Sequence, residues 1–461
     1  MDTAHNLTVM SSKPNKRVLL TTPTWDGVIP FFQNRRRHKV NISELTNKRE
    51  LLELCMNAEV QMDFEWPFGG IHILKENIPS IDIMDYPTME EYEARLRDGH
   101  YDVVAMSFYR FNVPQVLKMV EMARNYGVKE LWAGNYGANS PGLERVFDRI
   151  IDSDGVAQMK LLVEGEPVEV RRHPILMGTM MRGVRVGYLY TGVGCRYLCK
   201  FCPTTTFMPD PFYTPIEEIR RVLDVYVKNG IQSVTILDET FLQDREHSAQ
   251  VIEELHKRGL IWHCTSRVTL FRGRVKELHS KGLRSIYTGV ETLANHTLTS
   301  YTKGQTVQSI LGLFKELNDL GITTTITYIF GFEFDTAESL LEAIDIIKND
   351  IRPFCLSLLV LTPHTNSQMK HIEDLTFDYD PVHYDSQYMV WKHPHLTPDE
   401  IYELVKIAHV ETTHPTNLIK KRIINRIKAL ESAGPLFSEK IDGLYTEHRN
   451  PPGGSGAVAL H

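Results

Sequence analysis

Three of the chain's 6 cysteines lie close together in the stretch TGVGCRYLCKFCPTTTF, residues 191–207. Cys195, Cys199 and Cys202 form a C-x3-C-x2-C array. Thiolates at this spacing can converge on one inorganic cluster, because a short loop turns its sulfurs inward while its backbone amides donate hydrogen bonds to them. Three thiolates leave one iron of a four-iron cluster without a protein ligand, and an open iron can bind a substrate or cofactor directly. The array therefore predicts a reactive iron–sulfur centre.

A structural zinc site is the second interpretation of the same cysteines. Structural zinc takes four ligands, so a distant histidine such as His263 would have to complete the set. Structural zinc normally uses paired ligand knuckles instead of a triplet at the end of a strand. The spacing therefore favours the iron–sulfur cluster. The other cysteines, Cys55, Cys264 and Cys355, are isolated in the sequence, and we expect them to be small buried side chains.

The segments that position the cysteines alternate between apolar runs and amphipathic helices from residue 185 to residue 365. The expected strands lie at 184–194, 232–239, 260–267, 283–291, 322–332 and 353–363, and the expected helices at 214–230, 244–259, 306–321 and 336–350. Repeated strand and helix units of this kind predict a partial (β/α)6 TIM-like barrel. Its active site would lie at the carboxyl ends of the strands, where the cysteines are.

Two further regions flank this barrel. Short apolar runs at 17–24, 101–109 and 129–139, with a helix that ends at Gly127, predict an open, mostly parallel sheet of Rossmann-like type over residues 15–170. Residues 366–450 predict a mostly helical C-terminal region that packs on the barrel. Tyr384, Tyr388 and Trp391 in this region are candidates to line a substrate pocket, with packing against the barrel as the alternative. The whole chain is therefore expected to be an α/β protein.

Charge and hydropathy exclude several classes of partner. The net charge of -7 gives no general attraction to nucleic acid or to an anionic membrane. No stretch reaches the roughly 18 apolar residues of a membrane-spanning helix, and the N-terminus lacks the apolar run of a secretory signal. We therefore expect a cytoplasmic protein without a membrane span or a nucleic-acid partner.

The stretch CRYLCKFC resembles the C-x3-C-x-aromatic-C signature of the radical SAM enzymes, with Phe201 as the aromatic residue. The resemblance extends over the barrel, residues 185–365. It implies a 4Fe-4S cluster whose open iron chelates the amino and carboxylate groups of S-adenosyl-L-methionine (SAM). Electron transfer then cleaves SAM to a 5'-deoxyadenosyl radical.

The same resemblance implies SAM-binding roles for residues at successive strand ends. Asp238 and Glu239 would accept hydrogen bonds from the ammonium group of SAM, and Arg267 would pair with its carboxylate. Glu291 would lie near the ribose, and backbone groups around Ile329 and Phe330 beside the adenine. A structural salt bridge is the alternative for any one of these carboxylates. The full predicted set is Phe201, Asp238, Glu239, Thr265, Arg267, Glu291, Ile329 and Phe330.

The N-terminal sheet resembles the cobalamin-binding domain that precedes the barrel in the class B radical SAM methyltransferases. The matching segments are RVLLTTPT, DVVAMSF, LWAGNYGAN and LLVEGEPVEV. The resemblance implies a cobalamin that meets the strand ends near Ser107, Tyr109 and Asn135. The sequence has no D-x-H-x2-G motif, so we expect no histidine ligand to the cobalt.

These resemblances imply a cobalamin-dependent methyltransferase that methylates an unactivated carbon of a small-molecule or natural-product substrate. An electron donor such as flavodoxin or ferredoxin would be its partner. One alternative is a radical SAM cyclase, or an enzyme of rearrangement or carbon–carbon bond formation, with an unconventional or lost cobalamin site. Another is a non-catalytic metal-binding protein.

Overall fold

A five-stranded parallel sheet lies at the centre of the first of two compact units in the computed structural model. The structure describes residues 16–24, 68–152, 154–180, 184–364, 367–413 and 418–431, together with Ile441 and Leu444. The first unit ends at Pro174 and the second continues from Ile175. Cys55, one of the isolated cysteines, lies outside the described residues.

The strands of the first sheet follow the order β2-β1-β3-β4-β5, and all their pairings are parallel. Their bounds are β1 (Val18–Thr21), β2 (Asp82–Met84), β3 (Val103–Ser107), β4 (Glu130–Gly134) and β5 (Arg149–Ile151). In a sheet of this order the connections reverse direction between β1 and β3, and ligands bind beyond the strand ends at that point. The open parallel sheet predicted from the sequence is confirmed.

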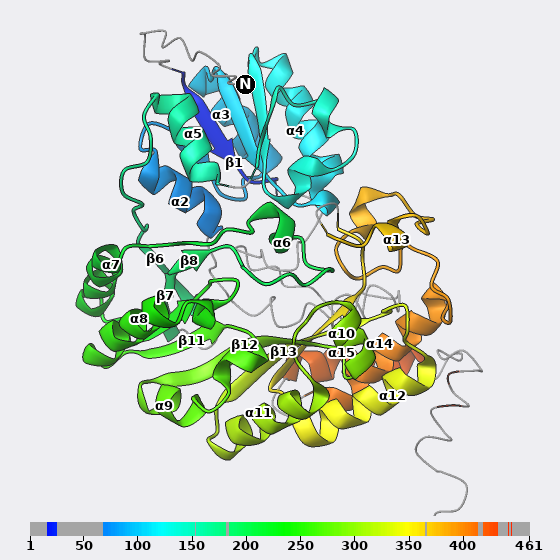
Figure 1. Cartoon of the computed structure of the whole chain (residues 1–461). Helices are drawn as coiled ribbons and strands as arrows, with labels where there is room; N and C mark the ends of the chain where they lie inside the picture. Colours follow the sequence, from blue (N-terminus) through cyan, green and yellow to red (C-terminus); the bar gives the residue numbers. More distant parts are fainter. Residues whose placement is uncertain are drawn as a thin grey trace, which may run out of the picture. The chain divides into compact units, whose positions relative to one another are not determined.

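Helices cover both faces of this sheet (Figure 1). Helices α2 (Gly69–Asn77) and α5 (Gly155–Glu164) pack on one face, where their apolar residues join Val18 and Trp132 in a buried cluster. Helices α3 (Met89–Gly99) and α4 (Val113–Asn125) contribute to a second cluster on the other face. Successive side chains of β1 and β3 point to opposite faces of the sheet, and helices bury both faces. This explains why the two strands are nearly continuous apolar runs.

A seven-stranded sheet forms the second unit, in the order β14-β13-β12-β11-β10-β7-β6. The strands are β6 (Leu176–Met180), β7 (Val184–Leu189), β10 (Ser233–Ile236), β11 (Ile261–Thr265), β12 (Leu283–Glu291), β13 (Thr323–Phe330) and β14 (Cys355–Val360). The six strands from β7 to β14 are parallel and adjacent in chain order, which confirms the predicted partial (β/α)6 arrangement. Strand β6 pairs antiparallel with β7 and was not predicted.

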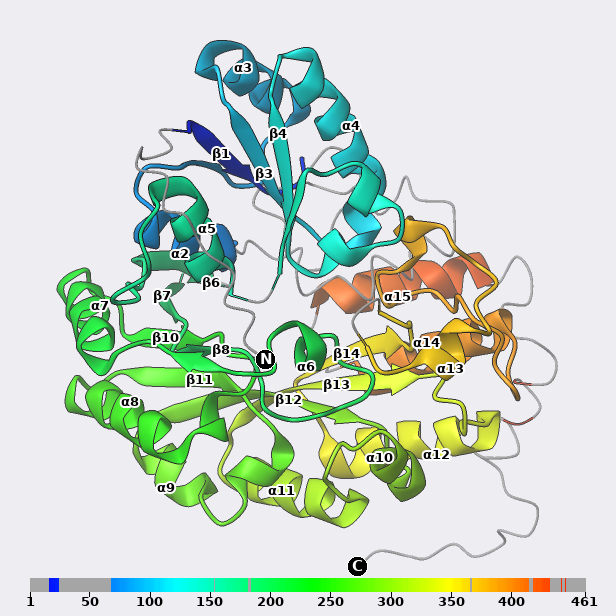
Figure 2. The ribbon, with the colours of Figure 1, turned by 45° about the horizontal axis from the view of Figure 1, so that its top comes forward.

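The helices between these strands lie along one side of the sheet (Figure 2). They are α7 (Ile216–Lys228), α8 (Arg245–Lys257), α9 (Val275–Ser280), α11 (Val307–Asp319) and α12 (Ala337–Ile346), which continues as a π-helical turn at Ile347–Ile351. Their buried residues and the strand residues beneath them form one large core. Four of the helices confirm the sequence prediction, whereas α9, with only 6 residues, was missed.

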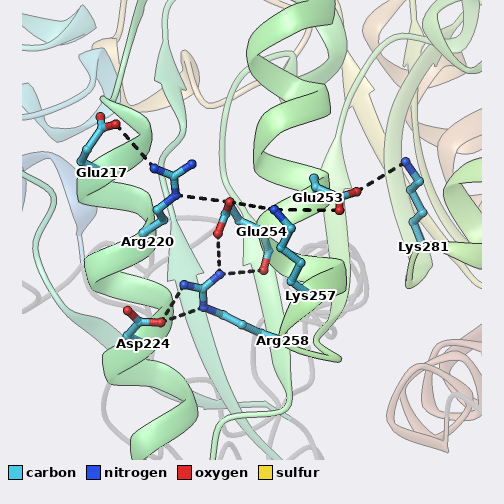
Figure 3. A network of polar contacts seen from close by, with 8 residues as sticks. All are labelled: Glu217, Arg220, Asp224, Glu253, Glu254, Lys257, Arg258 and Lys281. Atoms are coloured by element: carbon cyan, nitrogen blue, oxygen red, sulfur yellow. Dashed lines mark hydrogen bonds and ion pairs between the residues drawn. The ribbon is translucent and has the colours of Figure 1, made fainter.

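A network of charged residues joins α7 to α8 on the outside of this layer (Figure 3). Its centre is Glu254, whose side chain is only 8% exposed. Glu254 pairs with Arg258 at 2.7 Å, with Arg220 of α7 at 3.2 Å and with Lys257 at 3.5 Å. Hydrogen bonding from Arg258 lowers the pKa of Glu254 below its usual range. The network therefore ties neighbouring helices together through one ionised carboxylate.

The remaining described helices are α10 (Asn295–Ser300), α13 (Lys370–Glu373), α14 (Pro398–Thr412) and α15 (Leu418–Glu431). Helix α14 begins with a capping box between Thr397 and Glu400 and packs against α12 and β14. None of the helices in the described part of the chain is both long and apolar enough to cross a membrane.

Candidate active site

The cysteines lie on a loop between two short strands at the end of β7. Strand β8 (Gly192–Val193) pairs antiparallel with β9 (Phe212–Tyr213), and α6 (Thr204–Phe207) occupies part of the connection. Gly194 begins the loop with a φ of +96°, and a Cβ there would lie 2.9 Å from the carbonyl oxygen of Met208. Cys195 N donates a hydrogen bond to the same oxygen at 3.2 Å. Only glycine fits this start of the loop without a shift of the backbone.

The three thiols are close enough for their charges to interact. Burial raises the pKa of Cys202, and the charges of Cys199 and Cys195 raise it further. Cys202 N donates to Cys199 O at 3.0 Å, and Cys195 Sγ lies 3.5 Å from Thr240 Oγ1. Within the described ranges, no three Cys, His, Asp or Glu side chains are arranged to hold a single metal ion. A four-iron cluster does not need such convergence, because each cysteine binds a different iron.

Distant parts of the second unit fix the backbone of this loop. Thr302 Oγ1 donates to Leu198 O at 2.8 Å, across 104 residues of sequence. Lys200 N donates to Tyr301 O at 3.2 Å, and Lys200 O accepts from Gln368 N at 2.8 Å. The loop is therefore held by segments that follow it by at least 100 residues.

Asp238 and Glu239, at the end of β10, lie at the base of the loop. Both are predicted acceptors for the SAM ammonium group. Asp238 is buried and accepts hydrogen bonds from Thr191 N, at 2.7 Å, and from the Thr191 hydroxyl. Burial raises the pKa of Asp238 to about 7, although these hydrogen bonds oppose the rise. Glu239 Oε2 accepts from Gly194 N at 2.9 Å, so this carboxylate contacts the residue just before Cys195.

Gln243 holds the loop on both sides of Cys195 and was missed in the sequence. It belongs to the 3-10 helix η5 (Phe241–Gln243) and is 2% exposed. Its Nε2 donates to Gly194 O at 2.8 Å, and its Oε1 accepts from Arg196 N at 3.1 Å. The only signal in the sequence is an amide side chain shortly after the segment LDE at 237–239.

Arg267, which follows β11, directs its guanidinium at a cysteine. Arg267 is 7% exposed, and its Nη1 donates to Cys199 Sγ at 2.9 Å. Its Cζ lies 4.1 Å from the centre of the Tyr197 ring. The Nε of Arg267 is buried and has no hydrogen-bond partner among the described residues. A cation with an unused donor beside three thiols fits a group that carries negative charge, as an iron–sulfur cluster with thiolate ligands does.

Glu291, the predicted ribose contact, forms a buried ion pair. Lys303 Nζ lies 2.6 Å from Glu291 Oε1, and each side chain is no more than 10% exposed. The same ammonium lies 5.7 Å from the centre of the Phe201 ring, next to Cys202 in the sequence. A Cβ at Gly289 would lie 1.8 Å from Glu291 Oε1, so glycine provides the space for the pair.

The other predicted SAM contacts lie at the ends of β11 and β13 or on the loop. Thr265 is the last residue of β11 and pairs with Tyr287. Ile329 and Phe330 end β13 and are buried. The ring of Phe201 packs 5.9 Å from that of Phe332. All eight predicted residues therefore lie at the carboxyl ends of the parallel strands or on the cysteine loop.

The turn after β13 is fixed by Asp335 and His393. Asp335 Oδ2 accepts from Gly331 N at 3.0 Å and from Phe332 N at 2.9 Å, and burial raises the pKa of Asp335 to about 7. His393 Nε2 donates to Phe332 O at 2.7 Å, while its Nδ1 accepts from the backbone N–H groups of His395 and Leu396. A C-terminal segment therefore supports the strand end predicted to lie beside the adenine.

The candidate substrate residues differ in exposure. Trp391 is 1% exposed, and its Nε1 donates to Leu361 O at 3.1 Å. Tyr384 is 3% exposed, and its hydroxyl donates to Asp378 O at 3.0 Å. Tyr388 is half-buried and stacks on His383, with 4.4 Å between ring centres. The geometry of Trp391 and Tyr384 supports the packing role that the sequence left as the alternative.

His263, the histidine considered as a zinc ligand, lies in the middle of strand β11. Its Nε2 is 2.9 Å from Ser233 Oγ, and burial lowers the pKa of His263 to about 4. Cys264 beside it is buried, and Cys355 is partly buried at the start of β14.

The three predicted cobalamin contacts lie together in the first unit, at the carboxyl ends of β3 and β4. Ser107 pairs with Gly134 across these strands. Asn135 follows with a φ of +68° and accepts a hydrogen bond from Tyr136 N. Tyr109 stacks on Tyr136, with 6.0 Å between ring centres. The structure thus brings the three positions to one edge of the sheet.

Comparison with known proteins finds similarity over part of the second unit. Residues 189–347 match the model of the Radical SAM superfamily. An uncharacterized methyltransferase of Pyrococcus horikoshii is 24% identical over 252 residues, which are 52% of this chain and 54% of that protein. An anaerobic magnesium-protoporphyrin IX monomethyl ester cyclase of Rubrivivax gelatinosus is 30% identical over 176 residues, 37% of this chain and 32% of that one. The chain thus spans about half, or less, of the length of these relatives.

A solved structure shares the fold over nearly the whole chain. It is the radical S-adenosylmethionine methyltransferase TsrM from Kitasatospora setae with cobalamin and a [4Fe-4S] cluster bound. The two structures superpose with a TM-score of 0.60 and 13% identity, over 91% of this chain and 100% of TsrM. At this identity, the comparison establishes a common fold.

Proposed function

Because residues 189–347 are a radical SAM domain, we propose that this radical SAM enzyme is a cobalamin-dependent methyltransferase that acts on an unactivated carbon of a small molecule. The observation that carries the proposal is the cysteine loop at the end of β7, where Arg267 Nη1 donates a hydrogen bond to Cys199 Sγ. The shared fold with TsrM supports it further, since that enzyme binds both cobalamin and a cluster.

In this proposal Cys195, Cys199 and Cys202 hold a 4Fe-4S cluster and leave one iron open for SAM. When bound, the cluster and SAM supply a 5'-deoxyadenosyl radical, and cobalamin supplies the methyl group. Glu239 and Gln243 fix the backbone on either side of Cys195, so the first thiolate is held before the cluster enters. The loop is thus preorganised by groups outside it.

Asp238, Glu239, Arg267 and Glu291 are proposed to orient SAM, together with Thr265 and the end of β13. Asp238 already has two donors from Thr191, so its contribution would be to shape the base of the site. Ser107, Tyr109 and Asn135 are proposed to contact cobalamin in a domain of residues 15–170, ahead of a barrel at 185–365 and a C-terminal region at 366–450. We also propose a cytoplasmic location and an electron donor such as flavodoxin or ferredoxin.

The test is anaerobic reconstitution with iron, sulfide, SAM and a chemical reductant, with and without methylcobalamin. We expect 5'-deoxyadenosine from the native chain and S-adenosylhomocysteine when cobalamin is present. Cys199→Ala should abolish both products, and Cys264→Ala, the same change at a buried cysteine of β11, should retain them. Formation of 5'-deoxyadenosine by Cys199→Ala would contradict the proposal.

A radical SAM cyclase is the second candidate, favoured by the likeness to the Rubrivivax cyclase. The same assay separates the two functions. A cyclase would yield 5'-deoxyadenosine without S-adenosylhomocysteine, because no methyl group leaves SAM.

A further inference from the structure

The guanidinium of Arg267 interacts with a thiol instead of a carboxylate. Among the described residues Arg267 forms no ion pair, although its side chain is buried. A buried cation without a counter-ion is costly, so a negatively charged neighbour must offset its charge. The nearest polar partner is Cys199 Sγ, 2.9 Å from Nη1. As a ligand of the proposed cluster, Cys199 would be a thiolate and would place negative charge at this contact.

Two neighbours keep the guanidinium in this position. The ring of Tyr197, on the same loop, lies 4.1 Å from Arg267 Cζ, which is the distance of a cation–π contact. Gly304 is also close, since a Cβ there would lie 3.5 Å from Nη2, which is an ordinary van der Waals contact. The main chain of Arg267 is also fixed, because its carbonyl accepts from Leu270 N at 3.1 Å.

We propose that Arg267 sets the reduction potential of the cluster through its charge-assisted hydrogen bond to Cys199 Sγ. The inference rests on the proposed function only in that the cysteine loop holds a cluster. Reduction adds one negative charge to the cluster and its thiolates. A nearby cation and a donated N–H stabilise the reduced form more than the oxidised form, so Arg267 raises the potential. Arg267 therefore acts on electron transfer indirectly, through its hydrogen bond to Cys199.

The experiment is a redox titration of the anaerobically reconstituted full chain, followed by the electron paramagnetic resonance signal of the reduced cluster and carried out without SAM. Arg267→Met removes both charge and donor, and Arg267→Gln removes the charge but keeps a donor. At a fixed solution potential we expect the ratio of reduced to oxidised cluster to fall about tenfold in Arg267→Met, which is 59 mV for a one-electron couple. Arg267→Gln should show a smaller fall.

Two controls make the result specific. Arg221→Gln removes the same charge from α7, where Arg221 pairs with Glu218 at 2.8 Å, and should leave the potential unchanged. Tyr197→Leu removes the ring that holds the guanidinium and should lower the potential, whereas Tyr197→Phe should not. If Arg267→Met does not take up a cluster, the potentials of Tyr197→Leu and Tyr197→Phe still test the role of Arg267.

Unchanged potentials in Arg267→Gln and Tyr197→Leu would overturn the inference. If SAM binding weakens in the same Arg267 variant while the potential stays constant, Arg267 acts on the cofactor carboxylate instead. Absence of a cluster from the native chain would overturn the proposed function as well, so the two failures are distinguishable.

Discussion

Lys303 Nζ lies 2.6 Å from Glu291 Oε1 in a buried ion pair that spans the end of β12 and the segment after α10. Desolvation makes such a pair costly to break on one side, because the remaining charge stays buried without a partner. Lys303 Nζ also lies 5.7 Å from the centre of the Phe201 ring, so the ion pair is next to the cysteine loop.

The first prediction concerns this ion pair. Lys303→Met should lower the free energy of unfolding by about 3–5 kcal/mol, since it leaves Glu291 buried and uncompensated. The double variant Glu291→Gln, Lys303→Met should lose less than the sum of the two single variants. This double-mutant cycle is measured by denaturant unfolding of the apo forms of the native chain, the two single variants and the double variant. Strict additivity would show that the two charges do not interact.

Gln243 gives a second prediction, about the retention of the cluster. Gln243→Leu removes two hydrogen bonds, each worth about 0.5–1.5 kcal/mol, from the backbone around Cys195. We expect the reconstituted variant to lose its iron to a chelator roughly tenfold faster, measured by the decay of the visible absorbance. Gln243→Glu, which keeps the acceptor for Arg196 N, should be intermediate.

Gln115→Leu serves as the matched control, because Gln115 is a buried glutamine of the first unit that bonds to Thr24. It should leave the rate of iron loss unchanged. Equal rates for Gln243→Leu and the native chain would exclude a role of Gln243 in holding the loop.

The third prediction addresses the outer network of Figure 3. The folded pKa of Glu254 is lowered, so its stabilising contribution is present above the unfolded pKa and is lost as the pH falls through the folded value. At pH 7, Glu254→Gln should cost about 1.5–3 kcal/mol, the range for hydrogen bonds to charged groups. The cost should shrink below pH about 4 and in high salt.

Glu217→Gln tests whether position within that network matters. Glu217 is 75% exposed and pairs with Arg220 at 3.6 Å, so its loss should cost less than about 1 kcal/mol. Equal costs at positions 217 and 254, measured by denaturant unfolding, would show that burial of the central carboxylate is unimportant.

Asp335 provides a fourth prediction, with the opposite pH dependence. Burial raises the pKa of folded Asp335 to about 7, from an unfolded value near 3.8. Between these values the folded state holds a proton that the unfolded state releases, so stability falls as the pH rises, by at most about 1.4 kcal/mol per pH unit. Asp335→Asn keeps an acceptor for Gly331 N and Phe332 N and should remove this part of the slope.

The comparison requires unfolding curves between pH 4 and pH 8 for the native chain and for Asp335→Asn. Asp319→Asn is the control, because Asp319 is an exposed partner of Lys315. Parallel pH profiles for the native chain and Asp335→Asn would mean that Asp335 titrates normally.

The strand ends were predictable from the sequence because buried parallel strands and amphipathic helices leave distinct apolar patterns. Those patterns placed Asp238, Arg267 and Glu291 at the ends of successive strands, and the structure confirms the strands themselves. Strand β6 was missed because LMGTM precedes the regular alternation of strands and helices. Helix α9 was missed for its shortness alone.

The apolar patterns of the sequence do not show in which direction a polar side chain points. The sequence suggested a ligand role for Arg267 but could not show that its guanidinium turns to Cys199, 68 residues away. It likewise offered Glu291 as a ribose contact or a salt bridge, and the partner Lys303 became visible only when the chain was folded. Gln243 was overlooked because a single buried amide has no periodicity or motif.

The bond between Leu198 and Thr302 has a consequence for biogenesis. Thr302 leaves the ribosome 104 residues after Leu198, which at ordinary rates of translation is roughly 5–20 s later. Until then the cysteine loop lacks its hydrogen bond from Thr302, and we expect its thiols to be more accessible to oxidants and to other metal ions. Under the proposed function, we therefore expect the loop to take up iron and sulfide only after the chain has been synthesised beyond Thr302.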